Sequence, residues 1–423
     1  MALPFTGISQ ETLTVEDAIA LAMKHNYDIQ LATNSTEQAD NNQSIYNSGY
    51  LPTLTGSGNA SYANNNSKLT SQTGVETDIP GVESTQLGAS VELNYVLFNG
   101  GSRKYTYDKL KNMYALSSYD KQIQIENTLI DVYTTFFNVA RNQEQKTTLL
   151  EAYNISKERL DRVTAEQKYG QKTTLDVLNA RVDANTDSIT LVNLTVQLQN
   201  NIRNLNYLLG RDISTTFETS KDVSLEETLS YEVLLEQLKS ENNQIKQMAI
   251  NKAISEQEIK INQAGWLPSV STSVGYGLNY NDNGPAGFFA VQQSNGLNAG
   301  LSLSWNIFDG GTTKVNVQNA KIALKTQELN TKKLSLNLEN QLASYWAEYS
   351  TQKVIIKNEL INVEISNQNF LKSKELFNLG KITSLEYRTA QLNLINTKLN
   401  LLNAKYNAKI AELQLKKFAG LLS

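Results

Sequence analysis

Polar and apolar residues alternate one by one along four short segments of the chain. In residues 87–97, apolar side chains occupy the odd positions, and Gly, Ser, Glu and Asn occupy the even positions from 88 to 94. The other alternating segments are 53–62, 269–280 and 297–307. A period of two is typical of β-strands, and about 9–11 residues are enough for a strand to cross a membrane. We therefore predict two β-hairpins, over 50–98 and 266–308.

Longer segments follow each hairpin, and there the apolar residues recur at spacings of three and four. Residues 102–169 contain neither proline nor glycine, and Leu149, Tyr153, Leu160 and Val163 show the helical spacing. At about 1.5 Å per residue, a continuous helix of this length would extend roughly 100 Å. The spacing is typical of helices packed as in a coiled coil. The predicted long helices are 102–169, 173–209, 312–379 and 382–418.

The chain contains this pattern twice. The matching segments are 49–54 with 265–270, 95–101 with 305–311, and 168–176 with 378–386. Their offset is 216 for the first pair and 210 for the other two. The change falls within the hairpin, where differences in length are tolerated. We predict two structural repeats, 1–215 and 216–423, whose first helices run over about 14–48 and from about Ser224.

The polar faces of the predicted strands consist of small residues. Ser, Thr, Asn and Gly prevail there, which suits a narrow hydrated lumen better than the Lys and Glu of a soluble sheet. Segments 63–86 and 281–296, between the paired strands, are rich in Asn, Gly and Ser, and we predict them to be extracellular loops. A soluble sheet with one buried face is the alternative. Aromatic residues at the four strand ends nearest the helices favour a membrane, because such residues concentrate at its interfaces. They are Tyr50, Phe98, Trp266 and Phe308.

Four strands cannot close a membrane barrel by themselves. Open sheet edges are not tolerated in lipid, and closed membrane barrels begin at about eight strands. Two chains would supply eight strands and a lumen filled by side chains, whereas three chains would supply twelve and leave a passage. A role in transport favours three.

Composition and charge narrow the possible functions. The 423 residues include no Cys and one His, His25, and the net charge is -4. Disulfides and thiolate metal sites are therefore excluded, and a nucleic-acid partner is disfavoured because it requires a basic face. No phosphate loop or recognisable catalytic set is present, so we expect neither enzymatic activity nor a metal or cofactor.

The ends of the chain and its apolar content bear on localisation. No run approaches the ~20 apolar residues of a membrane-spanning helix. The first residues lack the charged and apolar regions of a signal peptide. The sequence is then either cytosolic as written or a mature form whose signal peptide has been removed, and the hairpins favour the second interpretation.

The duplicated order of helix, Leu-Pro, hairpin, Phe-Asn/Asp-Gly-Gly and long helices broken at a glycine resembles the TolC outer-membrane efflux protein family, from about Leu13 to Gly420. The resemblance implies a mixed α and β membrane protein that forms a homotrimer. Four strands per chain would contribute to a shared twelve-stranded barrel in outer-membrane lipid, and the long helices to an α-helical barrel in the periplasm. Its implied partners are a periplasmic adaptor protein and, through the adaptor, an inner-membrane pump.

The resemblance also assigns roles to residues near the glycine breaks. It implies that Tyr169, Gly170, Leu379 and Gly380 form periplasmic tips that contact the adaptor. It places Asp176 and Glu386 near the closed aperture, where threefold symmetry would make rings of carboxylates that favour cations. The alternative for both acids is a helix N-terminal carboxylate stabilised by the helix dipole.

The sequence departs from the family at this aperture. A second acidic ring is replaced by Thr389, and a Tyr and an Arg that join neighbouring hairpins are replaced by Phe377 and Ile382. We expect apolar packing around Phe377 and Ile382 to hold the aperture shut, with Glu386 as the main charge filter. A structural coiled-coil rod without transport activity is the alternative function. The substrate, whether drug, metal or protein, and the type of pump stay open.

Overall fold

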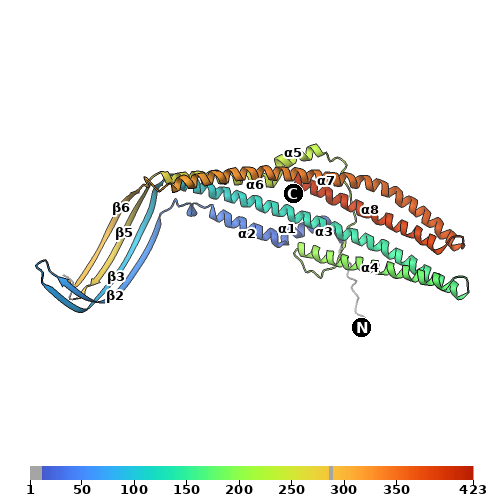
Figure 1. The fold of residues 1–423 in the computed structure, drawn as a ribbon, viewed down its shortest axis with the longest axis horizontal. Helices are drawn as coiled ribbons and strands as arrows, with labels where there is room; N and C mark the ends of the chain where they lie inside the picture. The colour runs from blue at the N-terminus through green and yellow to red at the C-terminus, as the bar shows by residue number, and fades with distance from the viewer. Residues whose placement is uncertain (1–11, 285–288, 423) are drawn as a thin grey trace, which may run out of the picture. The chain divides into compact units, whose positions relative to one another are not determined.

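The structure, a computed structural model, describes residues 12–284 and 289–422 (Figure 1). These residues form two compact units, each built from segments distant in the sequence. The helical unit comprises residues 12–35, 118–247 and 331–422. The strand unit comprises residues 36–117, 248–284 and 289–330.

Long helices form most of the helical unit. A two-stranded parallel sheet of β1 and β4 lies beside them. The elements that fall wholly or partly in this unit are β1 (Thr12–Leu13), α1 (Val15–His25), α2 (Tyr27–Asn42), α3 (Ser102–Lys168), α4 (Thr174–Leu208), β4 (Glu218–Thr219), α5 (Tyr231–Glu241), α6 (Asn243–Gln263), α7 (Thr312–Asn378) and α8 (Ser384–Phe418). None of the helices in the described ranges is long and apolar enough to cross a membrane.

Three apolar clusters hold the helical unit together. The largest packs Leu13 and α1 against α3, α4 and α8, with Phe136, Phe137 and Tyr406 at its centre. A second cluster joins α5 to α7 and α8. The third, near the turns that end α3 and α7, contains Phe370, Phe377 and Tyr387 among others. Burial of such side chains is worth about 1.5–3 kcal/mol each, so these clusters fix the arrangement of the helices around the turns.

The strand unit contains a four-stranded antiparallel sheet in the order β2-β3-β5-β6. Its strands are β2 (Thr53–Thr70), β3 (Glu76–Asn99), β5 (Ser269–Asp282) and β6 (Val291–Ser304). In the central part of the sheet the alternation keeps its phase from strand to strand, so that polar positions pair with polar or glycine positions: Thr55 with Glu92, Glu92 with Gly275 and Gly275 with Asn298. The sheet therefore has one polar face and one mostly apolar face.

Residues 63–86 are not the long loop that we predicted. β2 and β3 continue past the alternating segment, and the connection between them is only residues 71–75. Pairing through Asn64 with Glu83 and Lys68 with Asp78 needs only backbone groups, so it continues where side-chain alternation has ended. In the second hairpin the strands likewise enter 281–296, of which residues 285–288 lie outside the described residues.

The first helix of each half also differs from its prediction. Instead of one helix over 14–48, α1 and α2 are separated by Asn26, whose backbone is extended with φ -64° and ψ 129°. The Asn26 side chain accepts from the N–H of Asp28 at 2.9 Å and donates to the carbonyl of Leu208 at 2.8 Å. Such local bonds compete with helical ones, so the helix restarts here. In the second half, helix α5 begins at Tyr231 and not near Ser224.

The two halves of the chain carry the same sequence of long elements. α3 and α7 each have 67 residues, and α4 and α8 each have 35. Asn242 bonds in the second half as Asn26 does in the first, donating to the carbonyl of Phe418 at 3.1 Å. Both compact units contain segments from each half, so the units are not the two repeats. The division of the repeats at 215/216 stays a prediction.

Candidate functional site

Two tight turns connect α3 to α4 and α7 to α8, and both depend on a glycine. Gly170 and Gly380 have φ of +73° and +67°, a region that side chains with a Cβ rarely adopt. In each turn, the residue after the glycine donates its N–H to the carbonyl five residues earlier, at 3.0 and 2.8 Å. This pattern is the Schellman motif that ends many helices. Tyr169 and Leu379 are largely exposed beside these glycines.

The next helix starts in the same way in both turns. Thr173 and Thr383 are the N-cap residues, and each accepts a hydrogen bond at 3.2 Å from the backbone N–H of an acid three residues later, Asp176 or Glu386. The acid in turn accepts from the N-cap backbone N–H, at 2.9 Å for Asp176 and 2.7 Å for Glu386. These are complete capping boxes.

Backbone hydrogen bonds set the charge of these two acids. The bond from the N–H of Thr173 lowers the pKa of Asp176, and the bond from the N–H of Thr383 lowers the pKa of Glu386; the threonine hydroxyls add to both effects. Glu386 is exposed and Asp176 is half-buried, and the lowered pKa of each keeps both carboxylates ionised at neutral pH. Asp176 and Glu386 therefore act as acids at helix N-termini, which was the alternative interpretation. Their role in an aperture stays a prediction.

Phe377 lies in the apolar cluster beside the second turn. It is 5% exposed, and its ring stacks on that of Tyr387 with centroids 4.7 Å apart and planes 4° from parallel. The guanidinium of Arg162 lies over the ring of Phe377, 5.1 Å from its centroid. Ile382 packs against the same cluster, and Thr389 is exposed and donates its hydroxyl to the backbone of its own helix at 3.0 Å. Phe377 and Ile382 therefore join helices within one chain.

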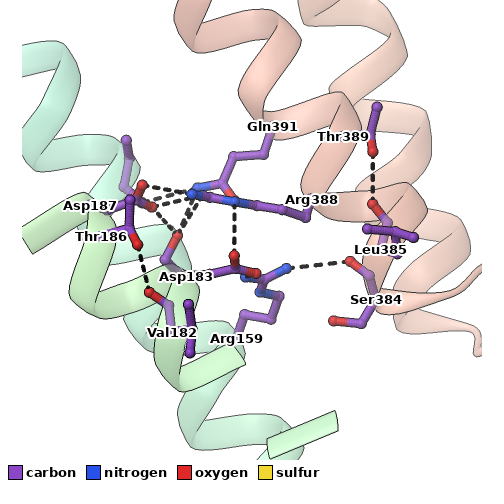
Figure 2. Close-up of polar contacts among 12 residues, drawn as sticks. Arg159, Val182, Asp183, Thr186, Asp187, Ser384, Leu385, Arg388, Thr389 and Gln391 are labelled. Atoms are coloured by element: carbon purple, nitrogen blue, oxygen red, sulfur yellow. Dashed lines mark hydrogen bonds and ion pairs between the residues drawn. The ribbon is translucent and has the colours of Figure 1, made fainter. Parts of the chain in front are cut away.

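A group of buried charged residues, which the sequence analysis did not identify, lies deeper in the same region (Figure 2). Arg388 on α8 binds the carboxylate of Asp187 on α4 through two hydrogen bonds of 2.7 Å. Asp187 also accepts from the hydroxyl of Ser156 on α3. Arg159 on α3 pairs with Asp183 on α4, and Arg388 Nε lies 3.8 Å from Asp183 Oδ1. We call Ser156, Arg159, Asp183, Asp187, Arg388 and Gln391 the ion-pair network.

The remaining contacts of the network tie it to the backbone. Gln391 accepts from Arg388 at 3.1 Å and donates to the carbonyl of Ala152 at 3.0 Å. Arg159 donates to the carbonyl of Ser384, in the first turn of α8, at 3.3 Å. The network thus links α3, α4 and the start of α8 in one set of charge-assisted bonds, which are stronger than neutral ones.

Burial makes these pairs sensitive to the loss of either partner. The side chains of Arg159, Arg388 and Asp187 are 2%, 7% and 11% exposed. Removing one partner from a buried pair leaves an uncompensated charge, at a cost of about 3–5 kcal/mol. The sequence contained one signal of this network. Arg388 is the only arginine in residues 212–423, and every other basic residue there is lysine. An arginine among lysines suggests planar, two-bond recognition of a carboxylate.

The predicted interface aromatics all lie in the strand unit, next to the ends of the strands. Phe98 is in β3, Trp266 precedes β5, and Tyr50 and Phe308 are outside the strands. Phe98, Trp266 and Phe308 are exposed, whereas Tyr50 is covered by the guanidinium of Arg103, 4.5 Å from its ring centroid. Contact with lipid at these residues stays a prediction.

Both halves of the chain match a known protein family. The sequence model of a family described as outer membrane efflux protein matches residues 18–211 and 234–421. No match was found among curated protein sequences.

Solved structures of outer membrane channels share the fold. The CmeC outer membrane channel of Campylobacter jejuni has a TM-score of 0.82 and 20% identity, covering 96% of this chain and 85% of that one. VceC, an outer membrane protein of Vibrio cholerae, has a TM-score of 0.79 and 15% identity, with 96% of each chain covered. The MtrE outer membrane channel of Neisseria gonorrhoeae, in its open state, has a TM-score of 0.75 and 16% identity, with 96% and 89% covered.

The family match covers most of the chain and includes both halves. It favours a channel over the alternative of a structural rod, and the predicted resemblance and fold class are confirmed. The chain belongs to the outer membrane efflux protein family and is an efflux channel of the outer membrane.

Proposed function

We propose that this channel is a homotrimer that forms the exit duct of a tripartite efflux or type I secretion system. It would receive substrates from an inner-membrane pump through a periplasmic adaptor. The proposed assembly rests on two stripes of exposed apolar residues, one on α4 and one on α7, which are the outermost of the long helices in the helical unit.

Contacts within the chain give the order of the four long helices in this unit. α4 packs on α3 through the ion-pair network, and α3 meets α8 through hydrogen bonds such as Arg141 to Asn407 at 3.1 Å. α8 meets α7 through Ser366 and Thr397, whose hydroxyls are 2.8 Å apart, and through the Phe377 stack. The order is therefore α4, α3, α8, α7, which leaves α4 and α7 at the ends.

Both end helices carry apolar residues that remain exposed. On α4 they are spaced by three, four or seven residues, which is the pattern of a coiled-coil seam. On α7, the spacing of Val354, Ile361 and Ile365 is similar. All of these side chains are more than half exposed. The α4 stripe consists of Leu175, Leu178, Val182, Ile189, Val192 and Val196.

A second copy of the chain accounts for both stripes. If α7 of one protomer packs on α4 of the next, the contact is head to tail, and such contacts form a ring when the rotation between protomers closes. Three copies would also bring together twelve strands, which satisfies the requirement that no sheet edge faces lipid.

Cysteine cross-linking tests this arrangement, because the chain has no native cysteine. Val192 and Ile361 lie at similar distances from their hairpin turns, so the double variant Val192→Cys/Ile361→Cys should form disulfide-linked trimers on oxidation. Each single variant is the control and should run as a monomer in denaturing gels after heating. Dimers alone, or ladders without a closed trimer, would contradict the ring. The wild-type protein should require detergent for extraction and run as a heat-modifiable oligomer.

We further propose that the two turns contact the adaptor and that the acids beside them line the aperture. Exposure of Tyr169 and Leu379 supports the first role, and the ionised state of Asp176 and Glu386 supports the second. Glu386→Gln in planar-bilayer recordings should reduce cation selectivity. Unchanged selectivity in that variant would exclude Glu386 as a filter.

Closure of the aperture would then rest on contacts within each chain. The Phe377 stack joins α7 to α8, and the ion-pair network joins α8 to α3 and α4. The ion-pair network and the contact of Arg162 with the Phe377 ring would have to rearrange for one hairpin to move relative to the other. The sequence alone led us to expect that apolar packing at Phe377 and Ile382 holds the aperture shut. We now propose that the buried ion pairs contribute as well.

A further inference from the structure

The polar face of the four-stranded sheet carries one charged side chain. Within the paired ranges 53–61, 88–94, 269–279 and 294–304, every residue except Glu92 is uncharged. The rest of this face is Ser, Thr, Asn and Gly. A single carboxylate on a surface otherwise free of charge requires a reason, because nothing about strand formation or pairing favours glutamate there.

The neighbours of Glu92 leave room for its side chain. Its partner on β2 is Thr55, and its partner on β5 is Gly275. A Cβ at Gly275 would lie 3.5 Å from Glu92 Cγ, so the glutamate side chain extends over the glycine. Asn298 follows on β6 in the same row. Larger side chains at these positions would crowd the carboxylate.

A hollow of about 440 Å³ surrounds this row. Its lining includes Asn59, Glu92, Gly275, Asn279 and Asn298. Amide and hydroxyl groups therefore lie around an acid within a space large enough for a hydrated ion or a small organic group.

The carboxylate of Glu92 has no partner in the part of the chain that the structure describes. No hydrogen bond or ion pair among residues 12–284 and 289–422 reaches it, and it is exposed to solvent. The acid Glu76 of the same hairpin differs, because it forms an ion pair of 2.7 Å with Lys68. Glu92 thus keeps an uncompensated negative charge on a face that is otherwise neutral.

We propose that Glu92 is a cation-selecting residue inside the barrel, in addition to the carboxylates near the turns. The inference rests on the proposed function, in which the polar sheet face lines the lumen and each protomer contributes one copy. Three symmetry-related carboxylates would then face one passage at the same height. Such a ring attracts cations and repels anions, and its effect is strong because no other fixed charge on that face offsets it. Ammonium groups of cationic substrates would meet the same field.

Planar-bilayer recordings under a KCl gradient test this role. Glu92→Gln keeps the size and removes the charge, so the ratio of potassium to chloride permeability should fall by about twofold or more. Glu92→Lys should shift the reversal potential further in the same direction. The control is Glu83→Gln on the same strand, which lies at an odd position and therefore on the opposite face; its selectivity should match the wild type.

The outcomes separate this inference from the proposed function. A wild-type protein that forms no conducting oligomer would contradict the proposed function. A conducting wild type whose selectivity is unchanged by Glu92→Gln and Glu92→Lys would leave that function intact and overturn the role of Glu92. An equal loss of selectivity in Glu83→Gln would also overturn it, because the effect would then be one of general surface charge. Heat-modifiable oligomers of each variant establish that the channel is assembled.

Discussion

The two helical hairpins of the helical unit, α3–α4 and α7–α8, share their backbone devices and differ in their charges. Each turn has a left-handed glycine followed by a Thr-x-x-acid capping box. Deeper in each hairpin, Ser156 and Ser366 occupy positions related by the offset of 210. Ser156 bonds the carboxylate of Asp187, whereas Ser366 bonds the hydroxyl of Thr397, the equivalent residue.

The ion-pair network forms because the two hairpins differ in their charged residues. The first hairpin supplies the acids Asp183 and Asp187, and the second supplies Arg388, whose equivalent in the first is Leu178. A duplicated hairpin thus became a complementary pair through a few changes in charge. The repeat thus preserves the turns, while contacts between the hairpins depend on residues in which the two copies diverge.

The largest expected effect is the loss of Arg388. Arg388→Met should destabilise the helical unit by about 3–5 kcal/mol, because Asp187 would remain buried without its partner. Thr397→Val, in the other hairpin, should cost only about 1 kcal/mol, since it removes a neutral hydroxyl that bonds Ser366 and the carbonyl of Leu394. Thermal unfolding of the detergent-solubilised protein, followed by circular dichroism, measures both. Equal losses of stability in the two variants would mean that the buried ion pairs stabilise the protein no more than a neutral hydrogen bond does.

Phe377→Ala should have the next largest effect. Removing a buried, stacked ring from the cluster beside the second turn should cost about 3 kcal/mol. The equivalent residue in the first hairpin, Gln167, is partly exposed, and Gln167→Ala should change stability by about 0.5 kcal/mol or less. Hydrogen exchange of the two hairpins would locate the change. Faster exchange in α3–α4 alone would contradict a role for Phe377 in joining α7 to α8.

The two turn glycines should respond alike. Gly170→Ala and Gly380→Ala should each cost about 1–2 kcal/mol, because an alanine must adopt a positive φ there. The space around both glycines is open, so no steric clash adds to this cost. Unfolding of the two variants under the same conditions gives the comparison. A much larger loss at one turn would show that its surroundings, and not the shared backbone conformation, set the cost.

The smallest effect concerns pH. Because hydrogen bonding lowers the pKa of Asp176 and of Glu386, each acid stabilises the fold above its unfolded pKa, and this contribution is lost as pH falls through the folded pKa. Thr173→Ala and Thr383→Ala should move these pKa values up and cost about 1 kcal/mol as caps. Carboxyl-carbon NMR titration of labelled protein reports the shifts. An unchanged pKa of Glu386 in Thr383→Ala would contradict a contribution of the threonine hydroxyl, since the alanine keeps the backbone N–H that bonds the carboxylate.

Much of the fold follows from local pattern. The long helices begin and end within two residues of their predicted limits, because glycines and N-cap threonines mark those limits in the sequence. The predictions failed where backbone bonding does not depend on side-chain pattern, as in the strands beyond Tyr62. They also failed at Asn26, where one side chain interrupts an otherwise helical segment.

The candidate site was predictable only in part. The family resemblance pointed to Asp176 and Glu386, and their capping boxes are local features of the sequence. The ion-pair network joins residues as far apart as Ser156 and Arg388, and no local spacing brings them together. The exposed apolar stripe on α4 has a clear heptad pattern in the sequence. Which helix would cover it depends on the order of the helices, which the structure supplies.

The order of strands in the sheet has a consequence for mixtures of subunits. β2 and β6 are the outer strands, and each lacks a neighbour on one side within the described chain. In the proposed ring, β6 of one copy would complete β2 of the next. A chain with a damaged outer strand would then disable every ring that it enters, including the intact copies beside it. Defects in these two strands should therefore be dominant when damaged and normal chains are made in the same cell.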